Sequence, residues 1–125
     1  YWFRSRKPVD YPVPTDGPVG LILHGTGRHS WRPAHLHYLI YKDGFQTIQT
    51  EMFNSDSKYL DSDAVFGVKE SLIIPYEKID DPARAEEYGF NGPFYEGIFD
   101  FVMKDDASVK DAEAAYSERA SMSSS

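Results

Sequence analysis

Two histidines separated by one residue are the side chains of this chain best suited to chemistry. They are His35 and His37, in the segment Arg-Pro-Ala-His-Leu-His. Successive side chains of a β-strand point to opposite faces, so these two project to the same side, about 7 Å apart along the strand. Two imidazoles at that distance can bind one metal ion. Imidazole suits zinc, copper, iron and nickel alike, so the pair predicts a metal site without naming the metal.

The residues around the pair predict the strand that must position it. Residues 35, 37, 39 and 41 share one face, and residues 36, 38 and 40 share the other. Asp43-Gly44 follows directly and is typical of a hairpin turn. Residues 46–53 then predict the return strand. We therefore expect the histidines on the first strand of a β-hairpin.

The register of this hairpin decides what faces the histidines, and the sequence leaves two alternatives open. A two-residue turn at Asp43-Gly44 places Glu51 on the far face. A three-residue loop, with Gly44 in the left-handed conformation, places His35 opposite Glu51 and His37 opposite Gln49. A slip of one residue therefore moves a carboxylate into the site or out of it.

Length and composition set limits on the class of protein. The 125 residues suffice for one domain or part of one, and 15% aromatic residues favour β structure. A net charge of −7 argues against nucleic acid or an anionic membrane as a partner. The chain has no cysteine, which excludes disulfides, iron–sulfur clusters and thiolate zinc sites. No apolar run approaches the length of a membrane span.

Patterns elsewhere in the chain predict an all-β fold with short helical turns in its loops. Strands are expected over residues 1–7, 19–24, 71–76 and 94–103, in addition to the hairpin. A helical turn is expected over residues 61–68, capped by the Asp61–Asp63 segment, and another within a surface loop over residues 77–92. Six or so short strands predict a sandwich or a barrel. Residues 105–125 are polar and predict a mobile tail, with a weak helix over residues 110–119.

Four linked motifs connect the chain to a known family. They are Tyr-Pro-Val-Pro-Thr-Asp-Gly-Pro-Val-Gly from Tyr11, Gly-Arg-His from Gly27, Arg-Pro-Ala-His-Leu-His from Arg32, and Tyr-Leu-Asp-Ser-Asp-Ala-Val-Phe-Gly-Val from Tyr59. With these motifs the chain resembles the intradiol ring-cleavage dioxygenases, in the catechol and hydroxyquinol 1,2-dioxygenase branch. The resemblance implies a catalytic β-sandwich over residues 1–104, without its N-terminal portion, followed by the tail over residues 105–125.

The resemblance also implies a ligand set. In this family a non-haem ferric ion is held by two tyrosinates and two histidines. Tyr11 lies 24 residues before His35 and matches the second family tyrosine, and His35 and His37 match the histidines. Phenolate oxygens are hard anionic donors that favour Fe(III). The first family tyrosine would lie upstream of Tyr11, so we expect the chain to be the C-terminal part of a longer protein.

Two further residues are candidates for a catalytic role. Arg32 matches the family arginine that lies beside bound catecholate, where a guanidinium can stabilise negative charge that develops on the ring. Glu51 stands where the catalytic branch usually carries glutamine, and its carboxylate can pair with Arg32 and weaken its field. His29 is expected to be a hydrogen-bonded loop histidine.

The function implied by the resemblance is cleavage of a catechol-type diol by O₂ to a cis,cis-muconate-type dicarboxylic acid. The implied partners are a small aromatic diol and O₂, without nucleic acid or membrane, in a cytoplasmic and homodimeric parent protein. One alternative is a truncated non-catalytic fragment or pseudoenzyme that lacks one tyrosinate. A second is a cupin-type centre of histidines and the Glu51 carboxylate. The sequence does not distinguish catechol, hydroxyquinol and substituted catechols as substrates.

Overall fold

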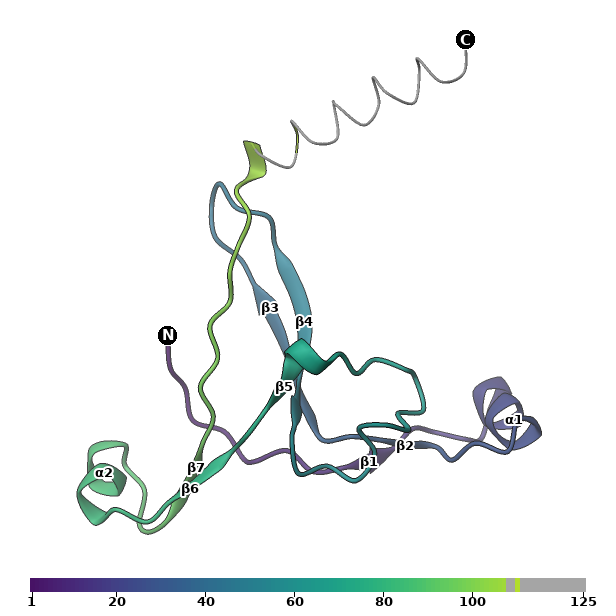
Figure 1. Ribbon diagram of the computed structural model, residues 1–125, viewed down its shortest axis with the longest axis horizontal. Helices are drawn as coiled ribbons and strands as arrows, with labels where there is room; N and C mark the ends of the chain where they lie inside the picture. Colours follow the sequence, from purple (N-terminus) through teal and green to yellow (C-terminus); the bar gives the residue numbers. More distant parts are fainter. Residues whose placement is uncertain (108–109, 111–125) are drawn as a thin grey trace. The chain divides into compact units, whose positions relative to one another are not determined.

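A computed structural model of the chain describes residues 1–107 and 110, and its elements are labelled in Figure 1. The strands in this described part are β1 (Tyr11–Pro12), β2 (Trp31–Arg32), β3 (His35–Ile40), β4 (Ile48–Asn54), β5 (Ile73–Ile74), β6 (Glu77–Ile79) and β7 (Phe94–Glu96). The helices are α1 (Pro18–Gly25), the 3-10 helix η1 (Glu70–Leu72) and α2 (Pro82–Glu87). The expectation of mostly strands with few short helices is confirmed. Among the described residues, no helix is long and apolar enough to cross a membrane.

The chain divides into two compact units. The first unit contains residues 1–36 and 51–99, and the second contains residues 37–50 and the residues from 100 onward. The helix expected over residues 110–119 and most of the expected tail lie outside the described residues.

The first unit contains the buried core and three strand pairings. β1 pairs with β2 and β6 pairs with β7, both antiparallel, whereas the end of β4 runs parallel to β5. The buried hydrophobic residues are Leu23, Ala34, Met52, Phe53, Ala64, Ile74, Ala85 and Phe94. Met52 and Phe53 are fully covered, so the end of β4 lies in the core of this unit.

The second unit is organised around the turn of the hairpin. The Phe45 N–H donates to the Lys42 carbonyl at 3.1 Å, and Gly44 adopts a left-handed φ of 79°. A turn at Asp43-Gly44 is therefore confirmed, but the strands do not keep the register that a two-residue turn predicts, since the Asn54 N–H donates to the Ala34 carbonyl. Phe45 forms a bridge with Asp105, and the Gln46 N–H donates to the Lys104 carbonyl at 2.8 Å, so a later segment runs beside the turn.

The strand predicted over residues 19–24 is wrong, because this segment lies in the helix α1. Pro18 stands at the start of the helix, where its fixed φ is favourable and its missing N–H costs nothing. Thr26 closes the other end, where its hydroxyl donates to the Ile22 carbonyl at 2.8 Å. A short apolar run suits a helix as well as a strand, and the proline at its start is the signal that separates the two.

Several other predicted elements are shorter than expected or differ in type. Residues 1–7 form no strand, and the strands predicted over residues 71–76 and 94–103 shrink to β5 and β7. No helix forms over residues 61–68. The Asp63 carboxylate accepts instead from the N–H groups of Val65 and Gly67 and caps a turn. The segment 77–92 contains the expected helical turn as α2, together with the strand β6.

Candidate metal centre

The antiparallel pair β1–β2 places Tyr11 directly across from Arg32. The Val13 N–H donates to the Ser30 carbonyl at 2.8 Å, which extends the contact beyond the two-residue strands. Just before β1, an Asp10 carboxylate oxygen accepts from the Ala34 N–H at 2.8 Å. The proline-rich segment around Tyr11 is therefore fixed to the chain on both sides of Arg32, although the two residues are far apart in sequence.

Tyr11 and His35 meet in the first unit. The Tyr11 hydroxyl oxygen lies 3.5 Å from Nε2 of His35, and the ring centroids are 5.4 Å apart. Nδ1 of His35 lies 2.7 Å from the Pro33 carbonyl oxygen. A carbonyl only accepts, so Nδ1 carries the hydrogen and Nε2 presents its lone pair towards Tyr11. Metal-binding histidines are commonly oriented by such a hydrogen bond from the second ring nitrogen.

His37 follows two positions after His35 in the same strand, β3. The alternation of side chains along a strand puts both imidazoles on one face of β3. His35 is buried in the first unit, whereas His37 is exposed and belongs to the second unit.

Arg32 is enclosed by two carboxylates. Its Nε and Nη2 atoms donate to the two oxygens of Asp63, at 3.0 and 3.2 Å. Its Nη2 also donates to Glu51 Oε2 at 2.9 Å. Nη1 lies 3.2 Å from Nε2 of His35. The guanidinium therefore occupies a fixed position against the nitrogen of His35 that faces Tyr11.

The charges of this network are mutually stabilised. Burial opposes the charge of Arg32, but hydrogen bonds with Asp63, Glu51 and Tyr11 outweigh burial and raise the pKa of the guanidinium. Burial likewise opposes the charge of Asp63, but hydrogen bonds from Arg32, Gly67 and Val65 outweigh it and lower the pKa of the carboxyl. Both side chains are therefore charged at neutral pH.

Gly67 provides the room that this network needs. A Cβ at this position would lie 2.9 Å from Arg32 Nη2 and 3.2 Å from Asp63 Oδ2. It would also lie 3.4 Å from Glu51 Oε2. The Gly67 N–H itself donates to Asp63 Oδ2 at 2.8 Å. A glycine at this position thus lets the backbone approach the ion pairs closely.

Glu51 lies on the same face of the strands as His35. One of its carboxylate oxygens and one imidazole nitrogen of His35 are within 4.8 Å of each other. This agrees with the hairpin alternative that brings the carboxylate into the site, and not with the one that places Glu51 on the far face. The pairing of the strands differs from that expectation. The Asn54 N–H donates to the Ala34 carbonyl, and the ring centroids of His35 and Phe53 are 5.4 Å apart. Phe53, and not Glu51, is therefore the residue across from His35.

The first unit therefore brings together four of the five predicted site residues, Tyr11, Arg32, His35 and Glu51. His29 is engaged elsewhere: Nδ1 accepts from the Trp31 N–H at 3.1 Å, and Nε2 lies 2.9 Å from the Ser62 hydroxyl. Its expected place as a hydrogen-bonded loop histidine is confirmed. Sequence reasoning missed Asp63 as a member of the site, because its contact with Arg32 spans 31 residues and no local pattern reports it.

The donor groups at this site fit a ferric ion. A phenol oxygen is a hard donor that becomes anionic on binding, and the Nε2 lone pair of His35 faces it. A second imidazole follows on the same face of β3. The Glu51 carboxylate, by contrast, is already paired with Arg32 at 2.9 Å, which makes it a poorer candidate for a ligand.

Comparisons with known proteins identify the family of the chain. A sequence model of the family described as dioxygenase matches residues 1–104. The chain is 53% identical over 104 residues to hydroxyquinol 1,2-dioxygenase of Rhizobium sp. (strain MTP-10005), covering 82% of this chain and 35% of the relative. It is 39% identical over 120 residues to the intradiol ring-cleavage dioxygenase hqdA of Aspergillus niger, covering 96% of this chain and 36% of the relative.

Solved structures of the same family are also similar to the chain. Hydroxyquinol 1,2-dioxygenase from Pseudomonas putida DLL-E4 superposes with a TM-score of 0.70 at 50% identity, over 79% of this chain and 35% of that one. Catechol 1,2-dioxygenase from Acinetobacter sp. ADP1 gives a TM-score of 0.73 at 31% identity, over 78% of this chain and 32% of that one. The chain thus spans about a third of the length of the relatives it matches. On the family match and these identities, the chain belongs to the intradiol ring-cleavage dioxygenases.

Proposed function

We propose that this chain supplies Tyr11, His35 and His37 as ligands of a non-haem Fe(III) centre, in a protein that cleaves an aromatic 1,2-diol with O₂. The product is a ring-opened dicarboxylic acid of the cis,cis-muconate type. The observation that carries the proposal is the position of the Tyr11 hydroxyl, 3.5 Å from the unprotonated nitrogen of His35. In the whole protein a second tyrosinate, outside this chain, completes the ligand set.

A ferric ion held by Tyr11, His35 and His37 would supply Lewis-acid chemistry: the diol would bind it through both oxygens, and its ring would become reactive towards O₂. Tyr11 is the ligand best placed to give way to the diol, because its side chain is 39% exposed and stands on a two-residue strand. Its phenolate oxygen can then take up one proton that the diol loses on binding. His35 stays in place, since it is buried and held by the Pro33 carbonyl.

Arg32 supplies positive charge beside the bound ring. Its Nη1 lies 3.2 Å from His35 Nε2, so the guanidinium adjoins the atom that would bind the metal. A fixed cation at this distance stabilises negative charge that develops on the ring during attack, and it needs no reorganisation at that moment. The raised pKa of Arg32 keeps it charged throughout.

The substrate we propose is a small ring with two adjacent hydroxyls, either hydroxyquinol or a catechol. The names of the relatives support this class, since the first two structures are a hydroxyquinol and a catechol 1,2-dioxygenase. We further propose a cytoplasmic, homodimeric whole protein that uses neither nucleic acid nor membrane. The net charge of −7 supports the exclusion of nucleic acid.

Oxygen uptake tests the proposal directly. The protein, in its longest natural form and loaded with Fe(III), should consume one O₂ per hydroxyquinol or catechol and release a dicarboxylic acid. Resorcinol, whose hydroxyls are not adjacent, should give no uptake. Activity of the longer form with none from this chain alone would mean that residues 1–125 are a part of the enzyme. No uptake from either form, with iron bound, would contradict the proposed function.

A further inference from the structure

Asp63 makes the most buried ionic contact of the proposed ring-stabilising arginine. Its side chain is 2% exposed and that of Arg32 is 7% exposed, whereas Glu51, the other partner of Arg32, is 23% exposed. Asp63 accepts from Nε and Nη2 of Arg32, so both carboxylate oxygens bind one edge of the guanidinium plane. A two-point contact of this kind fixes the orientation of the plane as well as its distance.

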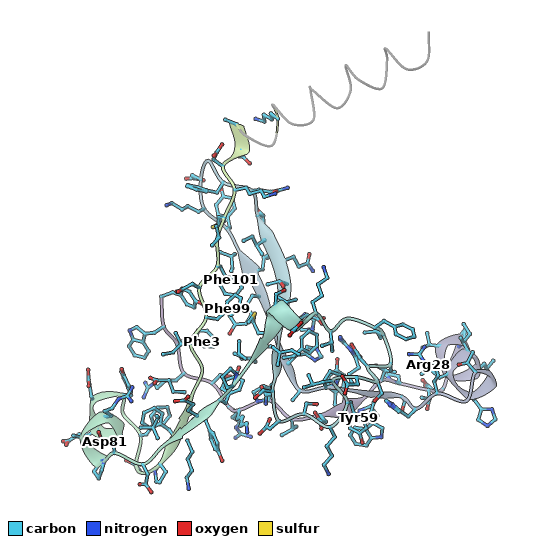
Figure 2. The ribbon with its side chains drawn as sticks, viewed as in Figure 1. Phe3, Arg28, Tyr59, Asp81, Phe99 and Phe101 are labelled. Atoms are coloured by element: carbon cyan, nitrogen blue, oxygen red, sulfur yellow. The ribbon has the colours of Figure 1, made fainter. Side chains whose placement is uncertain are left out.

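Hydrogen bonds within its own loop fix the position of the Asp63 carboxylate. The backbone N–H groups of Val65 and Gly67 donate to it at 3.2 and 2.8 Å. On the other side of the loop, Arg28 donates to the carbonyls of Asp63 and Ala64 at 3.2 and 2.8 Å, and Figure 2 labels this residue beside α1. The carboxylate is therefore anchored from its own loop and does not depend on Arg32 for its place.

The third nitrogen of the guanidinium lies beside the histidine of the proposed metal centre. Nε and Nη2 are held by Asp63, and Nη1 lies 3.2 Å from Nε2 of His35 and 3.4 Å from Glu51 Oε1. Without Asp63, Glu51 would be left as the carboxylate partner of this guanidinium among the described residues, at 2.9 and 3.4 Å. Glu51 would hold the arginine less firmly, because its side chain is 23% exposed and one of its two contacts is as long as 3.4 Å.

We propose that Asp63 is a positioning residue, which acts through Arg32 by aiming Nη1 at the ring of the bound diol. This inference rests on the proposed function and adds to it a residue that touches neither metal nor substrate. Asp63 is needed because a misaimed cation loses most of its effect on the developing charge, and a displacement of about 1 Å can cost about a hundredfold in rate. Gly67 contributes to the same positioning, because any side chain there would displace Nη2 of Arg32.

A double-mutant cycle on the diol-cleaving protein tests the inference. Asp63→Asn keeps the shape of the side chain and removes its charge, and should lower kcat about tenfold to a hundredfold with a smaller change in KM. In an Arg32→Gln background the same change should have almost no further effect on kcat, because the residue it acts through is gone. Equal effects of Asp63→Asn in both backgrounds, or an unchanged kcat in the single variant, would overturn the inference.

Controls separate positioning from loss of structure and from failure of the proposed function. The charge-matched control is Asp61→Asn, an exposed neighbour in the same loop, which should leave kcat unchanged. If Asp63→Asn does not fold, Gly67→Ala takes its place, because the new Cβ would displace Nη2 and should also lower kcat. A normal kcat in that variant would count against the inference. A native protein without diol-cleaving activity would contradict the proposed function itself, before any variant is compared.

Discussion

Nδ1 of His35 lies 2.7 Å from the carbonyl oxygen of Pro33, and this one contact decides which nitrogen of the ring is available to a metal. Nδ1 holds the hydrogen, so Nε2 is the donor, and it faces Tyr11. The short Pro-Ala spacer before the strand thus orients the first imidazole before any ligand binds.

His35→Asn should abolish iron binding, because asparagine is too short to bring a nitrogen donor to the same place. The measurement is iron per chain by elemental analysis after reconstitution with Fe(III). His24→Asn is the matched control, since His24 is exposed on α1 and should leave the iron content unchanged. Full iron content in the His35 variant would show that the metal binds elsewhere.

Tyr11→Phe should weaken the visible absorption of the iron-loaded protein and lower diol cleavage at least tenfold, because it removes one phenolate donor. Tyr95→Phe is a suitable control: this tyrosine is 50% exposed and lies on β7, away from β1 in sequence. A Tyr11→Phe spectrum equal to that of the native protein would remove Tyr11 from the ligand set.

Glu51→Gln should lower KM for catechol about three- to tenfold. The carboxylate lies within 4.8 Å of a His35 nitrogen, so its negative charge repels a bound diolate. It also pairs with Arg32 at 2.9 Å and partly neutralises the positive charge of the guanidinium. Glutamine keeps the size of the side chain and removes both effects. Steady-state kinetics at neutral pH give the answer, and a raised KM would mean that the carboxylate assists binding.

Stability in acid should depend on Asp63. Its pKa is lowered in the folded chain, so it binds a proton more readily when unfolded, and its contribution is present above about pH 4. The contribution is lost as the pH falls further, through the folded pKa. Loss of this buried partner should cost about 3 kcal/mol at pH 7. Urea unfolding of native protein and Asp63→Asn should therefore differ at pH 7 and converge below pH 4, and a constant difference would contradict this assignment.

Sequence patterns predicted the hairpin well because its signals are local. The alternation along β3 and the Asp43-Gly44 turn need no distant partner to be read. The strand predicted over residues 19–24 failed because a short apolar run fits either element, and α1 leaves Leu21 and Ile22 exposed.

The residues of the candidate site also differ in whether the sequence predicts them. His35 and His37 follow from their spacing, and Tyr11, Arg32 and Glu51 from the family motifs. Neither the histidine spacing nor the family motifs predict a role for Asp63, because this role depends on a contact with Arg32, 31 residues away in sequence. A buried arginine requires a carboxylate partner, but only the folded chain shows which of the many acidic residues meets that need.

The visible spectrum of the Fe(III)-loaded protein, before and after addition of catechol, tests the central claim most directly. The longest natural form should show a broad tyrosinate band that shifts to longer wavelength with catechol. The same band in this chain alone would mean that Tyr11, His35 and His37 suffice to form the centre. A colourless iron protein in both forms would contradict the account and would favour a centre of histidines and the Glu51 carboxylate.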